Sequence, residues 1–432
     1  MVNVSVSSSG RTSENSTTYT GALAIVTSLF FMWGFVTVLN DILVPHLKAI
    51  FDLSYAKVML IQFAFFSAYF IFSIPSAKLI DWIGYKRTMV FGLMTMGVGA
   101  LLFRPAASAA SYALFLCALM VLAAGITALQ VAANPYVAVL GPEKTSSSRL
   151  NLTQAFNSLG TTIGPYLGGL LILSANPKGL DELRQMPAAS LQAYRVQEAS
   201  SVKLPYLVIG IALILLGMVI SMVKLPAMPH AERRGETGLK TSLWKYPHLV
   251  LGAVGIFVYV GGEVSIGSFL INYFTQKNIG NITEVAAAGL VAYYWGGAMV
   301  GRFIGSAILQ KVETRIVLGI AAAAACGLVL TSMLTSGHFA MWSIILVGFF
   351  NSVMFPSIFT LGIAKLGPLT GDGSGMLIMA IVGGAIIPVM QGALADRVGI
   401  HHAFVLPVLC YVYIFYYALR GSKPSGPGIP AT

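Results

Sequence analysis

The sequence predicts an all-α polytopic membrane protein with twelve transmembrane helices in two six-helix bundles. Of its 432 residues, 56% are hydrophobic and 9% are charged, whereas soluble domains carry about 25% charged residues. The apolar runs are about 20 residues long and do not alternate with polar residues, which indicates helices rather than barrel strands. Backbone N–H and C=O groups in lipid must be hydrogen-bonded within the protein, so only helices and closed barrels can span the membrane.

One long polar segment, 226–247, has Pro at both ends and divides the apolar runs into six and six. We expect spans near 22–50, 55–79, 87–105, 112–141, 150–174 and 205–224, and then near 247–274, 284–309, 315–335, 340–365, 374–394 and 402–420. The resulting division is a disordered cytoplasmic tail (1–20), an N-terminal bundle (21–225), a cytoplasmic linker (226–246), a C-terminal bundle (247–421) and a cytoplasmic tail (422–432).

The basic residues set the expected orientation. Most of the 26 Lys and Arg residues fall on one side of the predicted spans when the N-terminus is placed inside, as the positive-inside rule requires. We therefore expect both termini in the cytoplasm and the chain in a bacterial inner membrane. The formal charge of +11 is then explained by helix ends that meet anionic lipid, and no loop interleaves bases and aromatics as a nucleic-acid surface would.

The sequence offers no constellation for catalysis or a bound cofactor. Cys117, Cys326 and Cys410 each lie inside an apolar run, so neither a disulfide framework nor a zinc site is expected. The six His form no HExxH pattern, and no phosphate-binding G-x-x-x-x-G-K-[ST] loop occurs. We expect no enzyme activity, no cofactor and no obligatory protein partner.

Polar residues at membrane depth are the candidate functional residues, because they are costly in lipid. The two intramembrane acids, Asp41 and Glu263, fall in the first span of each half. Matching polar spans in two bundles suit a transporter whose halves rock about a central site, so both acids are predicted coupling residues. The alternatives are an interfacial place for Asp41 and a structural hydrogen bond between helices for Glu263.

Neutral amides and aromatics in the same spans are the predicted substrate contacts. Amides at depth also serve as bonds between helices, and aromatics near a span centre also serve as packing, so these alternatives stand beside the binding role. Pro135 and Pro356 fall in equivalent spans of the two halves and are expected to bend their helices. The predicted substrate residues are Asn40, Gln130, Asn134, Gln154, Asn157, Asn272, Tyr293, Trp295 and Asn351.

Three long strings carry a family resemblance: FFMWGFVTVLNDILVPHLKAIF (30–51), ALQVAANPYVAVLGPE (128–143) and SRLNLTQAFNSLGTTIGPYLGG (148–169). They resemble the fucose–galactose–proton symporter family of the major facilitator superfamily. The loop AKLIDWIGYKR (77–87) matches that superfamily's loop signature in part. The resemblance implies a twelve-helix fold with alternating access to a central monosaccharide site.

The resemblance also implies roles for particular residues. It makes Asp41 a coupling or sugar-binding acid, and Gln154 and Asn157 contacts for sugar hydroxyls. One departure is Gln130, which stands where L-fucose permease has a glutamate. A neutral amide cannot take up a proton, so the chain looks closer to the glucose/galactose branch, with a role for Glu263.

We therefore expect a secondary active transporter that imports a monosaccharide, most readily a glucose/galactose-type hexose, by cation-coupled symport. The co-transported ion is left open between H⁺ and Na⁺. A desolvated carboxylate can exchange protons, and an ionised one can hold Na⁺ near Asp41 with oxygen ligands. The alternatives are an L-fucose/H⁺ symporter and a drug or metabolite exporter of the same superfamily.

Overall fold

The computed structural model describes residues 19–51, 55–172, 186–200, 202–226 and 242–427. Within these ranges, the side chains of 39–51, 55–59 and 165–172, several in 188–199 and that of Val285 lie outside the description. Every regular element of the described residues is helical, as the apolar runs predict.

The N-terminal half contains long helices that match the first six predicted spans. Helix α2 accounts for the second and third spans, because Gly84 (φ 79°, ψ 168°) turns the chain inside it. This positive φ is open to glycine without strain, and it lies in the loop expected between those two spans. The helices are α1 (Thr20–Phe51), α2 (Tyr55–Ser108), α3 (Tyr112–Val139), α4 (Ser146–Ile172), α6 (Ala188–Ser200) and α7 (Lys203–Met222), with a short turn η1 (Glu143–Thr145) before α4.

The C-terminal half is more broken. The tenth predicted span divides after Asn351, just before Pro356, and the eleventh is interrupted by the 3₁₀ turn η4 (Ala380–Val382). The break at Pro356 agrees with the expected effect of a proline that lacks a backbone donor. The helices are α9 (Pro247–Phe274), α10 (Glu284–Ile308), α11 (Thr314–Leu334), α12 (Gly337–Asn351), α13 (Met354–Gly362), α14 (Thr370–Met379), α15 (Gly383–Val398), α16 (Ile400–Ala403) and α17 (Val405–Tyr416).

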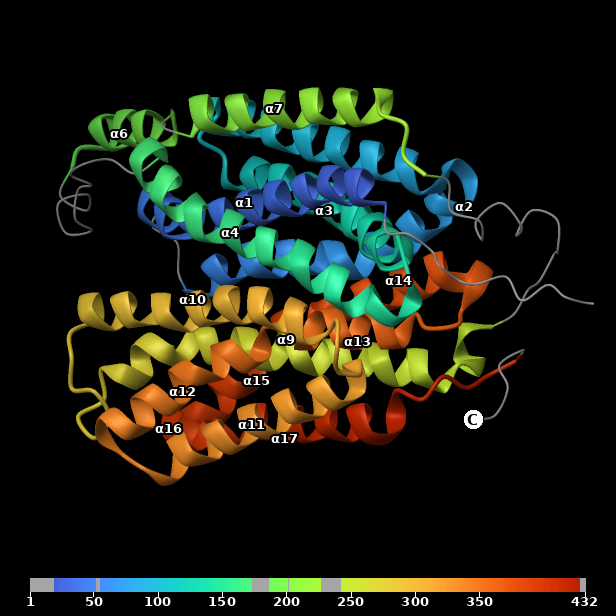
Figure 1. Ribbon diagram of the computed structural model, residues 1–432. Helices are drawn as coiled ribbons and strands as arrows, with labels where there is room; N and C mark the ends of the chain where they lie inside the picture. Colours follow the sequence, from blue (N-terminus) through green and yellow to red (C-terminus); the bar gives the residue numbers. More distant parts are fainter. Residues whose placement is uncertain (1–18, 52–54, 173–185, 201, 227–241, 428–432) are drawn as a thin grey trace, which may run out of the picture.

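The two halves form two layers with their long helices side by side, α1–α7 in one and α9–α17 in the other (Figure 1). Among the described residues, nine helical segments are long and apolar enough to cross a membrane. One of them is the double crossing of α2, while the more polar α4 and α10 are not among the nine. Counting these, the twelve predicted spans and the two six-helix bundles are confirmed.

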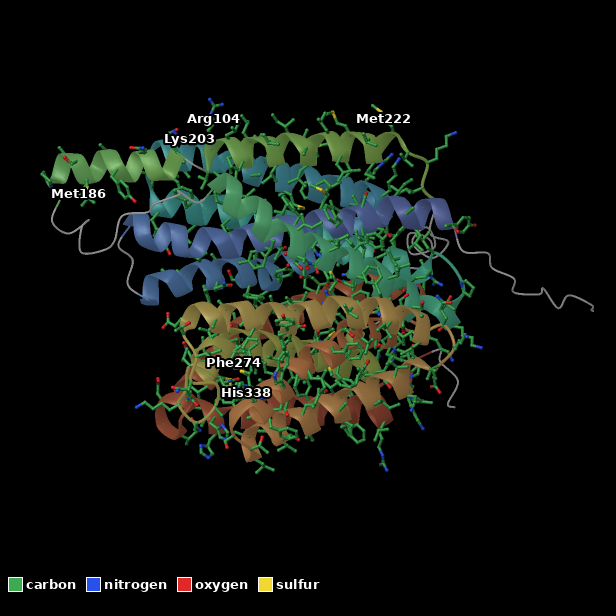
Figure 2. All side chains as sticks on the ribbon, turned by 60° about the vertical axis from the view of Figure 1, so that its left-hand side comes forward. Arg104, Met186, Lys203, Met222, Phe274 and His338 are labelled. Carbon is green, nitrogen blue, oxygen red and sulfur yellow. The ribbon has the colours of Figure 1, made fainter. Side chains whose placement is uncertain are left out.

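The outer faces of both layers are apolar. Met222 of α7 lies on the outer surface in Figure 2 with 81% of its surface exposed, and Ile320 of α11 and Leu409 of α17 are also exposed. Such surfaces are unusual in a soluble monomer and suit contact with lipid tails.

Both ends of the described chain lie at one end of the bundles (Figure 1). The backbone N–H of Tyr19 donates to the carbonyl of Leu140 at the end of α3 (3.2 Å). The tail meets the start of α9, where the N–H of Ser425 donates to Nδ1 of His248 (3.2 Å). We call this the terminal end; α6 lies at the other end.

Candidate substrate and coupling site

A network of buried polar groups surrounds Glu263 in α9. The Tyr259 hydroxyl lies 2.8 Å from Oε1 of Glu263 and 3.0 Å from the carbonyl oxygen of Asn351, so its single proton is shared between two acceptors. Tyr259 is one helical turn before Glu263, which puts both side chains on one face of α9. The carboxyl group is therefore held by a residue of its own helix, whose hydroxyl also bonds α12.

Asn351 at the end of α12 connects this pair to two other helices. Its Nδ2 donates to the hydroxyl of Tyr294 in α10, and its Oδ1 accepts from the hydroxyl of Tyr411 in α17, each at 2.9 Å. The Tyr294 hydroxyl also lies 3.4 Å from the carbonyl oxygen of Glu263. Because a buried polar group without a partner costs about 1–3 kcal/mol, these bonds fix four helices around one carboxyl group.

Arg302 in α10 connects the network to the N-terminal layer. Its guanidinium interacts electrostatically with Glu263, and its Nη1 donates to Oγ of Ser158 and to the carbonyl of Gln154 in α4 (3.5 Å to the latter). In return, Nδ2 of Asn151 in α4 donates to the Arg302 carbonyl (2.7 Å). A charged group thus lies at the seam between the layers, within electrostatic range of an acid of one layer and bonded to a helix of the other.

The same two helices meet again closer to the terminal end. Oγ of Ser148 donates to the carbonyl of Ser306 (2.7 Å), and Oγ of Ser306 donates back to the carbonyl of Ser148 (3.0 Å). These reciprocal bonds occur between α4 and α10, the two predicted spans that are not among the nine strongly apolar segments. Polar residues that would be costly against lipid are here used between the layers.

The N-terminal layer contributes a smaller polar group from α3. Nε2 of Gln130 donates to the Tyr69 hydroxyl of α2 (2.9 Å), and both residues are buried. One turn further on, Asn134 is buried, and neither polar atom of its side chain has a hydrogen-bond partner among the described residues. A buried amide in this condition is a favourable contact for a polar ligand.

The two amides of α4 take different positions. Gln154 is buried, and its backbone carbonyl accepts from Arg302. Nδ2 of Asn157 donates to the carbonyl of Phe30 in α1 (2.9 Å), beside Gly34, where a side chain would collide with Asn157. Asn157 thus helps to hold α1 against α4.

The other predicted site residues differ in what the structure says of them. Asn40 and Asp41 belong to α1, but their side chains lie outside the described residues, so their roles stay predictions. Asn272 is exposed near the end of α9, where its carbonyl accepts from Oγ1 of Thr275 (3.1 Å). It is therefore placed away from the Glu263 network.

The predicted aromatic pair of α10 is divided between two faces of that helix. Tyr293 and Trp295 are two positions apart, which is about 200° around a helix. Trp295 shares a face with Arg302 of the seam, seven positions on, and its ring packs over Gly267 of α9. Tyr293 is 60% exposed and packs edge-on against Trp342 at a ring distance of 5.9 Å. Trp295 thus lies on the face of α10 that carries Arg302, with 44% of its surface exposed, and Tyr293 lies on the opposite face.

Four residues of the network are absent from the sequence-based site: Tyr259, Tyr294, Tyr411 and Arg302. Arg302 satisfies the criterion that selects Glu263, because it is an ionisable residue in an apolar helix, and that criterion could have found it. The three tyrosines give no such signal, since tyrosine is common in membrane helices and its hydroxyl finds a partner only through packing.

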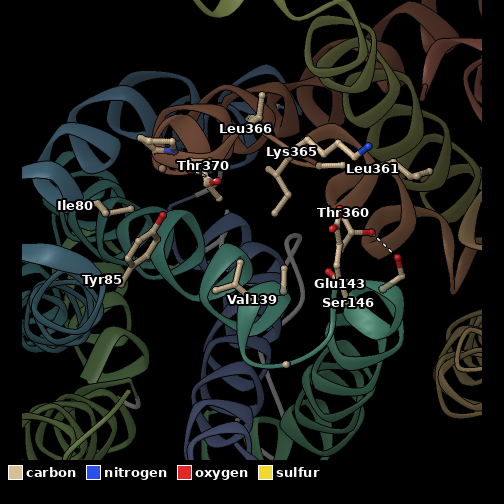
Figure 3. A pocket seen from close by; sticks show the side chains of 18 of the residues that line it. Ile80, Tyr85, Val139, Glu143, Ser146, Thr360, Leu361, Lys365, Leu366 and Thr370 are labelled. Carbon is tan, nitrogen blue, oxygen red and sulfur yellow. Dashed lines mark hydrogen bonds between the residues drawn. The ribbon is translucent and has the colours of Figure 1, made fainter. Parts of the chain in front are cut away.

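A hollow of about 520 Å³ lies between the layers near the terminal end (Figure 3). It is lined by Tyr85 and Glu143 from the N-terminal layer and by Lys365 and Thr370 from the C-terminal layer. Its lining residues are different from those of the Glu263 network. The layers are joined at this end, where Oγ of Ser147 lies 2.6 Å from Oγ1 of Thr360.

Comparison with known proteins agrees with this architecture. The family model described as Major Facilitator Superfamily matches residues 22–381. The chain belongs to the major facilitator superfamily. A protein of Brucella abortus named glucose/galactose transporter is 52% identical over 405 residues, covering 94% of this chain and 95% of that relative.

Two solved structures are also similar. The Escherichia coli fucose:proton symporter FucP matches with a TM-score of 0.86 and 35% identity, covering 93% of this chain and 99% of that one. A FucP structure described as being in the outward conformation matches with a TM-score of 0.85 and 35% identity, covering 92% and 97%. The resemblance read from the three sequence strings is confirmed.

Proposed function

We propose that this protein is a symporter that imports a monosaccharide together with a proton across a bacterial inner membrane, by alternating access between its two bundles. The glucose/galactose transporter of Brucella abortus supports a hexose of that type, and the fucose symporter supports the proton. The observation that carries the proposal is the Glu263 carboxyl group, which is hydrogen-bonded by Tyr259 and lies within electrostatic range of Arg302 at the seam.

In this mechanism Glu263 binds and releases the proton. When the carboxyl group is ionised, it attracts the Arg302 guanidinium and accepts a hydrogen bond from Tyr259. When it is protonated, the attraction is lost, and Arg302 is left with its bonds to α4. The charge state of Glu263 therefore changes how strongly α10 is held to α4. Asp41 is the second proposed coupling acid, in the equivalent span of the other bundle.

The sugar is proposed to bind between the bundles. Gln130 and Asn134 of α3 and Asn40 of α1 supply amides that bond hydroxyl groups, with further amides from Gln154, Asn157 and Asn351. Trp295 offers an apolar ring face for the C–H surface of the sugar. Asn272 and Tyr293 are weaker candidates, because they lie away from this region.

We infer that the terminal end is the cytoplasmic end, with both termini inside and the segment 226–246 as a cytoplasmic linker between the bundles 21–225 and 247–421. The bonds between the layers at this end then close the cytoplasmic side. The likeness to FucP in its outward conformation supports this assignment. A proton rather than sodium is favoured, since the fucose symporter is named for a proton.

The test is uptake into proteoliposomes of the purified protein. Radiolabelled glucose, galactose and L-fucose are offered under a pH gradient and, separately, a Na⁺ gradient. We expect the pH gradient to drive accumulation, and Glu263→Gln to abolish it while sugar counterflow is retained. Glu284→Gln, at an exposed acid in the first turn of α10, is the matched control. Equal accumulation by Glu263→Gln and wild type would refute the coupling role.

A further inference from the structure

Pro135 leaves one backbone carbonyl of α3 without its usual partner. In an α-helix the N–H of a residue donates to the carbonyl four positions earlier, and proline has no N–H. Pro135 lies inside α3, so the carbonyl of Val131 receives no bond from position 135. Val131 is fully buried, and water is therefore a poor substitute for the missing donor.

A serine from the other bundle supplies the donor. Oγ of Ser374 in α14 donates to the Val131 carbonyl at 2.8 Å, and Ser374 is itself fully buried. Close approach of α14 is possible because its neighbouring positions are small. A side chain at Gly375 would meet Ala77 and the Ser73 carbonyl of α2 at 2.8 and 3.2 Å.

We propose that Ser374 is a positioning residue of the transport cycle, and that its bond to the carbonyl freed by Pro135 sets how firmly the two bundles close at the terminal end. Both halves of this bond are needed. The proline removes the donor that would normally bond this buried acceptor within α3, and the serine reaches the acceptor only while the bundles are closed. When they separate, the acceptor must find water or remain unpaired.

This arrangement makes a specific claim about two substitutions taken together. With Pro135 present, Ser374→Ala leaves the Val131 carbonyl unpaired in the closed state. In the Pro135→Ala background, the restored N–H donates to that carbonyl, so the loss of the serine hydroxyl leaves the acceptor satisfied. Ser374→Ala therefore destabilises the closed state strongly when residue 135 is proline and weakly when it is alanine. A serine that served only for packing would have the same effect in both backgrounds.

The measurement is hydrogen–deuterium exchange of the full-length protein in nanodiscs, followed in peptides from 367–379. It needs neither sugar nor ion gradient. The proposal rests on the proposed function in one respect: it takes separation of the bundles at the terminal end to be a step of transport. Because exchange is measured without sugar, a negative result here is distinct from failure of sugar uptake. Peptides from α7 report whether any change is local.

We expect Ser374→Ala to speed exchange in 367–379 about tenfold, since it leaves a buried acceptor unpaired, and to leave α7 unchanged. In the Pro135→Ala background, the same substitution is expected to change the exchange rate about twofold or less. Ser357→Ala is the matched control, because Ser357 is equally buried and its Oγ has no hydrogen-bond partner among the described residues. It is expected to match wild type.

Equal effects of Ser374→Ala in the two backgrounds would overturn the proposal. Should Pro135→Ala fail to fold, Ser374→Cys decides, because a thiol of similar size is a weak donor. An exchange rate of Ser374→Cys between those of wild type and Ser374→Ala then supports the hydrogen bond. If Ser374→Ala exchanges no faster than Ser357→Ala, Ser374 has no role in closure.

Discussion

Replacement of Tyr259 by Phe tests whether the network around Glu263 serves proton release. The change removes one hydroxyl and keeps the buried ring. Hydrogen bonds to charged groups contribute about 1.5–3 kcal/mol, and the Tyr259 hydroxyl lies 2.8 Å from Oε1 of Glu263. Loss of this donor disfavours the ionised carboxylate by that amount. The equilibrium for proton release then falls about tenfold to hundredfold.

Tyr411→Phe is the control for this experiment. It also removes one buried hydroxyl that bonds Asn351, at 2.9 Å, but the lost bond is to Asn351 and not to the carboxyl group of Glu263. Both variants are expected to lose similar stability. Only Tyr259→Phe is expected to lower uptake driven by a pH gradient, while sugar counterflow, which needs no net proton release, is kept.

The assay is initial uptake into proteoliposomes under a fixed pH gradient, with counterflow and thermal unfolding measured on the same preparations. If Tyr259→Phe and Tyr411→Phe reduce driven uptake equally, the tyrosines act only through stability. If neither reduces it, the Tyr259 hydroxyl does not influence proton release.

Two further predictions concern packing and sugar contact. Gly34→Ala is expected to push α1 from α4 and to lower uptake at least tenfold, because an added Cβ meets the backbone and side chain of Asn157; Gly21→Ala, with open space around it, leaves uptake unchanged. Trp295→Ala is expected to raise the sugar concentration for half-maximal uptake about tenfold, since a ring face beside the seam is lost. Tyr293→Ala, on the opposite face of α10, is its control; equal effects of the two would disprove the assignment of faces.

The fold class and much of the site follow from the order of residues alone. Hydrophobicity is a property of each segment, so twelve spans, their division into six and six, and the break near Pro356 can be predicted without a structure. The cost of polar groups in lipid likewise selects Glu263 and Asn351, which the structure brings into one network.

The packing of the two bundles determines which partners these residues have. Periodicity assigns residues to the faces of one helix. Which residues of a neighbouring helix such a face contacts depends on how the bundles pack. For this reason the sequence-based site includes Tyr293 and leaves out Tyr294, although Tyr294 is the one of the two that bonds Asn351. A hydrogen bond such as that between Ser374 and the Val131 carbonyl joins residues 243 positions apart. It exists because a proline freed one buried acceptor and the fold placed a donor opposite it.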